Sequence, residues 1–173
     1  AAILVFKANI RLTSLYGIFG IGTLPEYVSI ALSIFTIIVI INAFNLIDGI
    51  NGLSGGIGLL ISITMGTWFF LIDRVDIAIV AFSLAGSLIA FLKYNVTPAQ
   101  IFMGDTGSLL LGLVCSILAI LFIDIHKDLG DHQYAFKSAP TLAIAVMILP
   151  LFDTLRVFII RILNGKSPFY PDR

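Results

Sequence analysis

Polar segments interrupt a strongly apolar chain, and the first of them carries two amides and a carboxylate at helical spacing. Asn42, Asn45 and Asp48 follow one another every third residue. At about 100° per residue, this spacing places the three side chains within a sector of about 120° on one helix face. Gly49 and Gly52 then free the backbone to turn. An ionisable group at the end of an apolar helix favours a functional site. The alternative is that Asp48 caps the next helix while the amides bond neighbouring helices.

The second polar segment, residues 104–108 (GDTGS), places a carboxylate at the start of a long apolar run. The free N–H groups of a helix N-terminus attract phosphate. A carboxylate beside a phosphate site is the arrangement with which proteins hold Mg²⁺. Asp105 is therefore a candidate metal ligand, although helix capping explains this segment equally well. Phe102 is of a type that stacks on a nucleobase, but taken alone it is better explained as a core aromatic.

The third segment places Asp153 and Arg156 one helical turn apart. An acid and a base at this spacing can form an ion pair on their own helix, and this interpretation is as well supported as one in which Arg156 meets substrate. Pro150 predicts a kink in the helix. Beyond it, Asn-Gly and two prolines predict that the helix gives way to a cationic loop at 164–173, which can hold an anionic substrate.

Transmembrane helices must position these segments. Of the 173 residues, 59% are hydrophobic and only 12% are charged, whereas a soluble domain has about 25% charged residues. This composition excludes a soluble globular domain and a disordered tail. Ten basic residues balance ten acidic ones, which excludes a basic nucleic-acid-binding protein. The single cysteine, Cys115, excludes an internal disulfide and a cysteine-based zinc cluster.

Five apolar stretches are long enough to cross about 30 Å of hydrocarbon, and no period-2 alternation favours a barrel. We therefore predict an all-α fold, a polytopic transmembrane helical bundle, as one integral-membrane domain over residues 1–173. Residues 1–6 are too short to span and lack the features of a signal peptide, so we expect the tail of a truncated helix. Small residues within the spans, Gly112 among them, predict close helix packing. The predicted spans are 27–47, 53–72, 76–93, 107–125 and 139–163.

Alternation of the spans assigns the loops to two membrane faces. The chain reaches one of them, here named the carboxylate face, after the first span, and it returns there twice, so Asp48 and Asp105 lie on the same side. On the opposite face we expect His126 and His132 to be solvated. Lysine and arginine divide equally between the two faces, so loop charge does not orient the chain. The loops of the opposite face are 7–26, 73–75 and 126–138.

Together, three stretches resemble the polyprenyl-phosphate N-acetylhexosamine-1-phosphate transferases, in the WecA/TagO-like branch of the superfamily that contains MraY. They are 42–53 (NAFNLIDGINGL), 102–112 (FMGDTGSLLLG) and 152–173 (FDTLRVFIIRILNGKSPFYPDR). The resemblance implies a multi-pass enzyme of the bacterial inner membrane whose active face is cytosolic. Such enzymes transfer a sugar-1-phosphate, here GlcNAc-1-phosphate by expectation, from a UDP-sugar to undecaprenyl phosphate. UMP is released, and assembly of a cell-envelope polysaccharide begins.

The resemblance also implies a role for each polar residue. Asp48 and Asp105 are the implied catalytic residues, and Asp105 is the implied ligand of Mg²⁺, with Mn²⁺ as the alternative ion. Phe102 is expected to lie against the uracil. Where the family usually has Asp, this chain has Asn51, an amide that can still donate to and accept from a uracil edge. The implied partners are the UDP-sugar, the polyprenyl phosphate and the membrane, with no nucleic acid and with a homodimer left open. The implied substrate-binding residues are Asn42, Asn45, Asn51, Phe102, Arg156 and Arg173.

Family members usually have more spans and two further motifs, so the resemblance implies a central fragment that is inactive on its own. One alternative is an MraY-type phospho-MurNAc-pentapeptide transferase, and another is a catalytically inactive scaffold. An ion-coupled membrane transporter, with Asp48, Asp105 and Asp153 as ion sites, is a further alternative. It is disfavoured because Asp48 and Asp105 lie at span ends, whereas transporter sites lie near the bilayer midplane.

Overall fold

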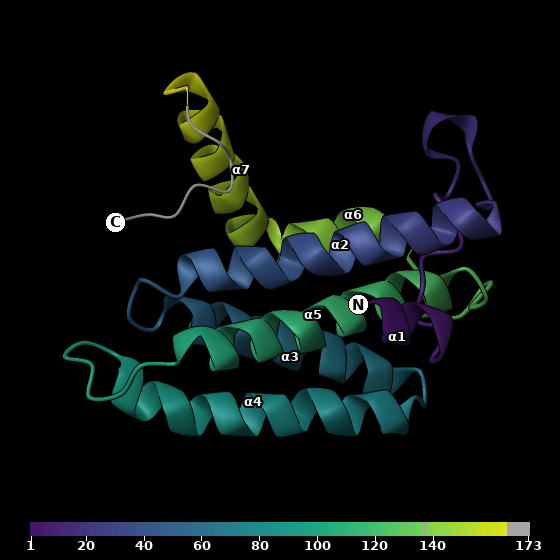
Figure 1. Cartoon of the computed structure of the whole chain (residues 1–173). Coiled ribbons are helices and arrows are strands. Elements are labelled where there is room, and N and C mark those ends of the chain that lie inside the picture. Colours follow the sequence, from purple (N-terminus) through teal and green to yellow (C-terminus); the bar gives the residue numbers. More distant parts are fainter. Residues whose placement is uncertain (137, 166–173) are drawn as a thin grey trace.

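Helices account for the regular structure of the chain in a computed structural model that describes residues 1–136 and 138–165 (Figure 1). In the described part there is no strand, only a β-bridge between Ser14 and Thr23. The predicted all-α class is therefore confirmed. The helices are α1 (Ala2–Phe6), the 3-10 helix η1 (Ile18–Gly20), α2 (Glu26–Ile47), α3 (Leu53–Leu71), α4 (Val75–Asn95), α5 (Gly104–His126), α6 (Ala139–Val146) and α7 (Ile148–Leu163).

Helices α2 to α5 are each long and apolar enough to cross a membrane. The shortest, α3, has 19 residues, which at about 1.5 Å per residue matches a bilayer core of about 30 Å. Turn residues set their limits, since Pro25 precedes α2 and Gly52, with φ +76°, precedes α3. These four helices coincide with the first four predicted spans to within three residues at each end.

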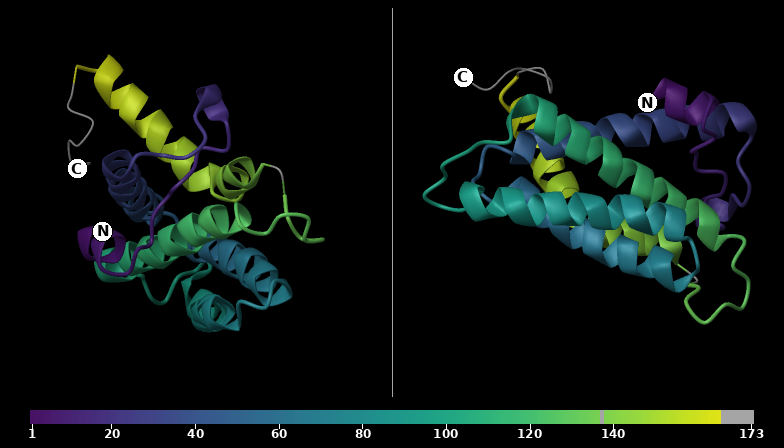
Figure 2. Two further views of the ribbon diagram at one scale, coloured as in Figure 1. Left: turned by 90° about the vertical axis from the view of Figure 1, so that its right-hand side faces the viewer. Right: turned by 90° about the horizontal axis from the view of Figure 1, so that it is seen from below.

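The fifth predicted span, 139–163, is two helices rather than one. Helices α6 and α7 meet at Met147 with a bend of 72°, and α7 turns away from the bundle (Figures 1 and 2). Pro150 explains the place of the break, because its ring clashes with the carbonyl four residues earlier, at Val146, and it has no N–H to donate there. The predicted kink is confirmed, but it lies three residues before the proline.

Two helix pairs, α2 with α5 and α3 with α4, make the most extensive contacts in the bundle. Large apolar side chains fill its interior, with Phe44, Ile61 and Phe69 fully buried. Small residues set the closest approach, because a Cβ at Gly112 of α5 would lie 2.7 Å from Cα of Ile41 in α2. The predicted use of small residues for helix packing is confirmed at this position.

We expect Gly112→Ala to lower the free energy of unfolding by about 1–3 kcal/mol, because the added methyl group meets backbone that cannot rotate away. The measurement is thermal unfolding in detergent micelles. Gly86→Ala is the matched control, since a Cβ at this helical glycine meets nothing within 4 Å. Equal midpoints for the two variants would contradict the close packing of α2 and α5.

The loops gather at the two ends of the bundle. Loops 48–52 and 96–103 lie together at the left in Figure 1, with the C-terminal end of α2 and the N-terminal end of α5. This end carries Asp48 and Asp105 and corresponds to the predicted carboxylate face. At the other end lie the loops 7–25, 72–74 and 127–136.

The prediction that His126 is solvated is wrong. Its side chain is the last of α5, is only 5% exposed, and stacks on Trp68 with ring centroids 4.2 Å apart and planes 7° apart. Trp68 in turn donates its indole N–H to the carbonyl oxygen of Tyr134 at 3.0 Å, which holds the following loop over the ring pair. His132, in that loop, is exposed as predicted.

Candidate active site

Asn45 connects the first two polar segments. Its amide nitrogen lies 3.1 Å from Ser108 Oγ and 3.4 Å from Asp105 Oδ1, so α2 reaches the first turn of α5. Ser108 is fully buried, whereas Asp105 is exposed. Asp105 does not cap α5, because the N-cap position belongs to Met103 and makes no side-chain bond. The capping alternative for Asp105 is therefore wrong, and its carboxylate stands open to solvent beside an amide donor.

Asp48 is held by the neighbouring helix. It is the C-cap residue of α2, and its Oδ1 accepts a short hydrogen bond from Ser54 Oγ, in the first turn of α3. Ser54 is 1% exposed and its hydroxyl also lies 3.9 Å from Met103 Sδ. Asp48 does not cap α3, whose N-cap is Gly52 without a side-chain bond. Three helices therefore fix the surroundings of the two carboxylates.

Asn95, the last residue of α4, joins the two loops of this end. Its side chain is 6% exposed; Oδ1 accepts the N–H of Gly52 at 2.7 Å and Nδ2 donates to the carbonyl of Ile101 at 2.9 Å. The loop that follows Asp48 is thereby tied to the loop that leads to Phe102. Asn95 was not among the predicted site residues, although it is an amide at the end of an apolar run, three residues before a proline.

We expect Asn95→Ala to destabilise the protein by about 1–3 kcal/mol, because the N–H of Gly52 and the C=O of Ile101 lose a partner in part-buried hydrogen bonds. The measurement is thermal unfolding in detergent micelles, with limited proteolysis of the loop 96–103 as a local readout. Asn164→Ala is the control, since Asn164 is exposed at the end of α7. If both variants unfold alike and resist protease alike, Asn95 does not hold the loops together.

The other predicted site residues are less closely joined to the carboxylates. Asn42 is exposed and donates to the carbonyl of Ile38 in its own helix at 2.7 Å. Asn51 is exposed in the turn before α3. Phe102 is 75% exposed, so its explanation as a core aromatic is wrong, and its ring is open to a ligand.

Arg156 pairs with Asp153 on its own helix, with Nη1 3.1 Å from Oδ1. The structure therefore shows the self-neutralising pair and does not bring Arg156 to Asp48 or Asp105. Arg173 lies outside the described residues, as does Lys166. The structure thus brings together Asn45, Asp48 and Asp105, and adds Ser54, Ser108 and Asn95 to them.

The donor set at this end fits Mg²⁺ that shares its ligands with a substrate. Among the described residues neither Asp48 nor Asp105 takes part in an ion pair, so their charges remain available. Within the same part of the chain, no three His, Cys, Asp or Glu side chains stand close enough to hold a metal ion by themselves. Mg²⁺ is commonly held by one or two carboxylates together with substrate phosphate oxygens, which is what these residues offer.

The chain is similar to known proteins over most of its length. The model of the family described as glycosyl transferase family 4 matches residues 1–123. The decaprenyl-phosphate N-acetylglucosaminephosphotransferase of Mycolicibacterium smegmatis is 35% identical over 89% of this chain and 41% of its own length. The probable undecaprenyl-phosphate N-acetylglucosaminyl 1-phosphate transferase of Bacillus subtilis is 36% identical over 82% of this chain and 37% of its own.

A phospho-N-acetylmuramoyl-pentapeptide-transferase of Rubrobacter xylanophilus is 43% identical, over 61% of this chain and 30% of its own length. The chain spans less than half the length of these relatives. The matched region 1–123 contains Asn45, Asp48 and Asp105, and it ends before α6. The resemblance of the chain to the superfamily of polyprenyl-phosphate sugar-1-phosphate transferases and MraY is confirmed. This chain belongs to glycosyl transferase family 4.

Proposed function

We propose that the protein transfers a sugar-1-phosphate, GlcNAc-1-phosphate in the first instance, from a UDP-sugar to a polyprenyl phosphate. The contact of Asn45 with Asp105 and Ser108 carries this proposal, because it unites two motifs 60 residues apart at one end of an apolar bundle. The choice of substrates is supported by the names of two relatives, which include a polyprenyl phosphate and N-acetylglucosamine. The chain covers about two fifths of their length, so activity and substrates are carried over as part of the proposal.

The reaction requires an oxygen of the polyprenyl phosphate to attack the β-phosphorus of the UDP-sugar. The bond from that phosphorus to the bridging oxygen breaks, and UMP leaves with the electron pair. Catalysis of such a transfer is mainly a matter of positioning and charge stabilisation. Mg²⁺, when held by Asp105 and Asp48 with the diphosphate, supplies the neutralising charge.

The chain's own residues orient the reactants in this proposal. Asn45 donates toward Asp105 and restricts the rotation of its carboxylate, while Ser54 does the same for Asp48. Free N–H groups in the first turn of α5 face the phosphates. The exposed ring of Phe102 stacks on the uracil, and the Asn51 amide meets the edge of the base.

Arg156 joins this site by exchanging partners. Its ion pair with Asp153 is exposed, with 63% of the arginine and 37% of the aspartate side chain accessible, and such pairs contribute about 0–1 kcal/mol. A phosphate group can therefore replace Asp153 as the partner of the guanidinium at little cost. We assign Arg156, with Arg173, to recognition of the sugar phosphate, and Asn42 to the rim of the same pocket.

Orientation is part of the same proposal. The relatives are bacterial, and the apolar helices make the protein a multi-pass membrane protein. We place it in the inner membrane with the carboxylate face toward the cytosol, where UDP-sugars are made.

The test uses membranes from cells that produce the full-length protein, supplied with undecaprenyl phosphate and single UDP-sugars. We expect UDP-GlcNAc to give a lipid-linked GlcNAc diphosphate and one equivalent of UMP, and we expect EDTA to stop the reaction until Mg²⁺ is restored. Product formed only from UDP-MurNAc-pentapeptide would favour the MraY-type alternative, to which the Rubrobacter relative points. Absence of any lipid product across the panel, in membranes that contain folded protein, would contradict the proposal.

A further inference from the structure

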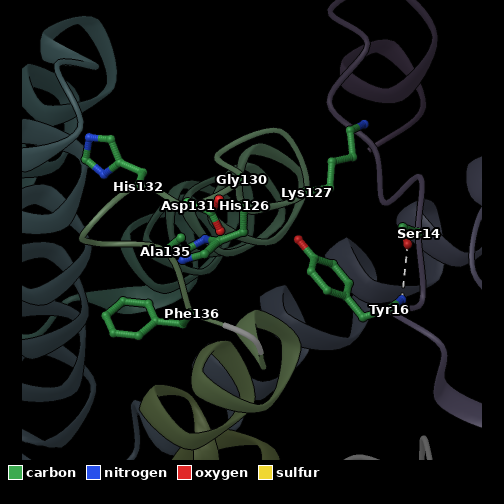
Figure 3. Close-up of a pocket in the computed structure, with 9 residues that line it drawn as sticks. All are labelled: Ser14, Tyr16, His126, Lys127, Gly130, Asp131, His132, Ala135 and Phe136. Carbon is green, nitrogen blue, oxygen red and sulfur yellow. Dashed lines mark hydrogen bonds between the residues drawn. The ribbon is translucent and has the colours of Figure 1, made fainter.

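The bundle has a second candidate site at the end opposite to the carboxylate face. A cavity of about 530 Å³ lies between the loop before α2 and the loop after α5, and Tyr16, His126 and Asp131 are among the residues that line it (Figure 3). Beside it lies an apolar cavity of about 350 Å³, lined by Trp68, Phe122 and Val146 among others. The two cavities share Phe136. A polar chamber thus adjoins an apolar one at the place where the spans end.

Tyr16 and Lys127, two of the hydrogen-bond donors that line the polar cavity, already have partners. The hydroxyl of Tyr16, which points toward the end of α5 in Figure 3, donates to the carbonyl of Ile123. The ammonium group of Lys127 donates to Thr13 Oγ1 and to Asp124 Oδ1, the latter at 3.0 Å. A ligand therefore finds few free donors on these walls.

Acceptors, by contrast, are free. His126 Nδ1 lies 2.7 Å from the carbonyl oxygen of Phe122, and because a carbonyl only accepts, Nδ1 carries the hydrogen. In the neutral ring Nε2 is then an acceptor, and this buried atom has no partner in the described part of the chain. Asp131 is exposed and forms no ion pair with any described residue. Both groups call for a ligand that brings N–H donors and positive charge.

The electrostatic surroundings favour the same kind of ligand. Burial, together with the negative charges of Asp124 and Asp128, raises the pKa of Tyr16 to about 12. Near this wall the carboxylates of Asp124, Asp128 and Asp131 outnumber the ammonium of Lys127, which pairs with Asp124. The aromatic faces of Tyr16 and Phe136 add to the attraction for a cation. Within the described residues no group of three side chains suits a metal ion, so the donor is better supplied by an organic ammonium.

We propose that this end of the bundle binds the primary ammonium headgroup of a phospholipid, with one acyl chain in the neighbouring apolar cavity. The ammonium group donates to His126 Nε2 and to Asp131. A small movement of the His126 ring, or of the loop after α5, is needed to expose Nε2, which is buried. A trimethylammonium headgroup has no N–H for His126, and an anionic headgroup meets the carboxylates unfavourably. The site does not depend on the transferase activity and lies at the other end of the helices.

Trp68 provides the measurement, because it is the only tryptophan in the chain, lines the apolar cavity and stacks on His126. We expect dihexanoyl phosphatidylethanolamine to shift its emission, in dodecyl maltoside, at concentrations at least about 5-fold lower than dihexanoyl phosphatidylcholine. A 5-fold ratio is about 1 kcal/mol, the net contribution of one typical hydrogen bond. Free ethanolamine, which lacks acyl chains, is expected to be weaker than the ethanolamine lipid.

Two variants test the binding of the headgroup and the binding of the acyl chain separately. Asp131→Asn is expected to lower the affinity for the ethanolamine lipid to that for the choline lipid. Val146→Phe is expected to lower the affinity for both lipids and to leave the affinity for free ethanolamine unchanged. Asp73→Asn is the matched control, since this loop aspartate does not line the cavity and its φ of +60° also suits asparagine. Equal affinity for the two lipids, or an unchanged preference in Asp131→Asn, would overturn the proposal. Free ethanolamine binding as tightly as the lipid would overturn the assignment of the acyl chain.

Discussion

Asp105→Asn is expected to reduce sugar-1-phosphate transfer by about 10³-fold, the scale of losing one preorganised charge interaction at a reacting phosphate. The asparagine keeps the size of the side chain and an oxygen that can accept the bond from the Asn45 amide, now 3.4 Å from Asp105 Oδ1. Folding should therefore be preserved while the negative charge is lost. The measurement is UMP release at saturating UDP-GlcNAc, together with a titration of Mg²⁺ that should no longer reach the activity of the unaltered protein.

A matched control for this experiment is Asp76→Asn. Asp76 lies in the first turn of α4, at the opposite end of the bundle, and its carboxylate is bound by Arg74 at 2.9 Å. The chemical change is the same, but the charge removed is exposed and remote from the reaction, so turnover should remain close to that of the unaltered protein. Near-normal turnover of Asp105→Asn at ordinary Mg²⁺ concentrations would contradict the assignment of Asp105 as a ligand of the metal ion.

Much of the fold could be predicted from the sequence because bilayer thickness dictates helix length. The contact between the first two motifs could not be predicted in the same way, because it depends on the register in which α5 packs against α2. In that antiparallel pair Gly112 meets Ile41, and four residues along each helix, toward the carboxylate face, Ser108 meets Asn45. The close approach at the glycine thus fixes the register that brings Asn45 to Asp105. Sequence spacing predicted the glycine and the amide separately, but only packing joins them.

Burial of single side chains was the least predictable feature. Because lipid and the protein interior are both apolar, the apolar side chains of a helix such as α2 face both, and their periodicity does not tell which of them are buried. Phe102, whose own segment alone favoured a place in the core, is exposed, whereas His126 was expected in water and is buried against Trp68. Asn95 was missed for a related reason, because its partners are backbone groups of Gly52 and Ile101, which no pattern of side chains reveals.

Asp48→Asn is expected to lower turnover by about 10²-fold without loss of folded protein. The asparagine can still accept the hydrogen bond from Ser54 Oγ, so the junction of α2 and α3 should persist while one negative charge leaves the phosphate-binding region. Ser54→Ala makes the complementary change, because it keeps the charge of Asp48 and removes the group that orients it. A freely rotating carboxylate is still attracted to Mg²⁺ but is less often in position, so we expect a smaller loss, of about 10-fold.

Comparing the losses of turnover in Asp48→Asn and Ser54→Ala distinguishes a catalytic role of Asp48 from a structural one. UMP release is measured beside the yield of monodisperse protein in detergent, so that activity is expressed per folded molecule. If Asp48→Asn aggregates while the folded remainder keeps its specific activity, Asp48 serves the helix junction and not the reaction. If Ser54→Ala loses as much activity as Asp48→Asn, the orientation of the carboxylate matters as much as its charge. If the loss is larger for Asp48→Asn than for Ser54→Ala, at equal yield, the charge of Asp48 itself serves phosphate transfer. Aspartate and asparagine at position 48 can both accept the hydrogen bond from Ser54, so the variant differs from the unaltered protein mainly in charge.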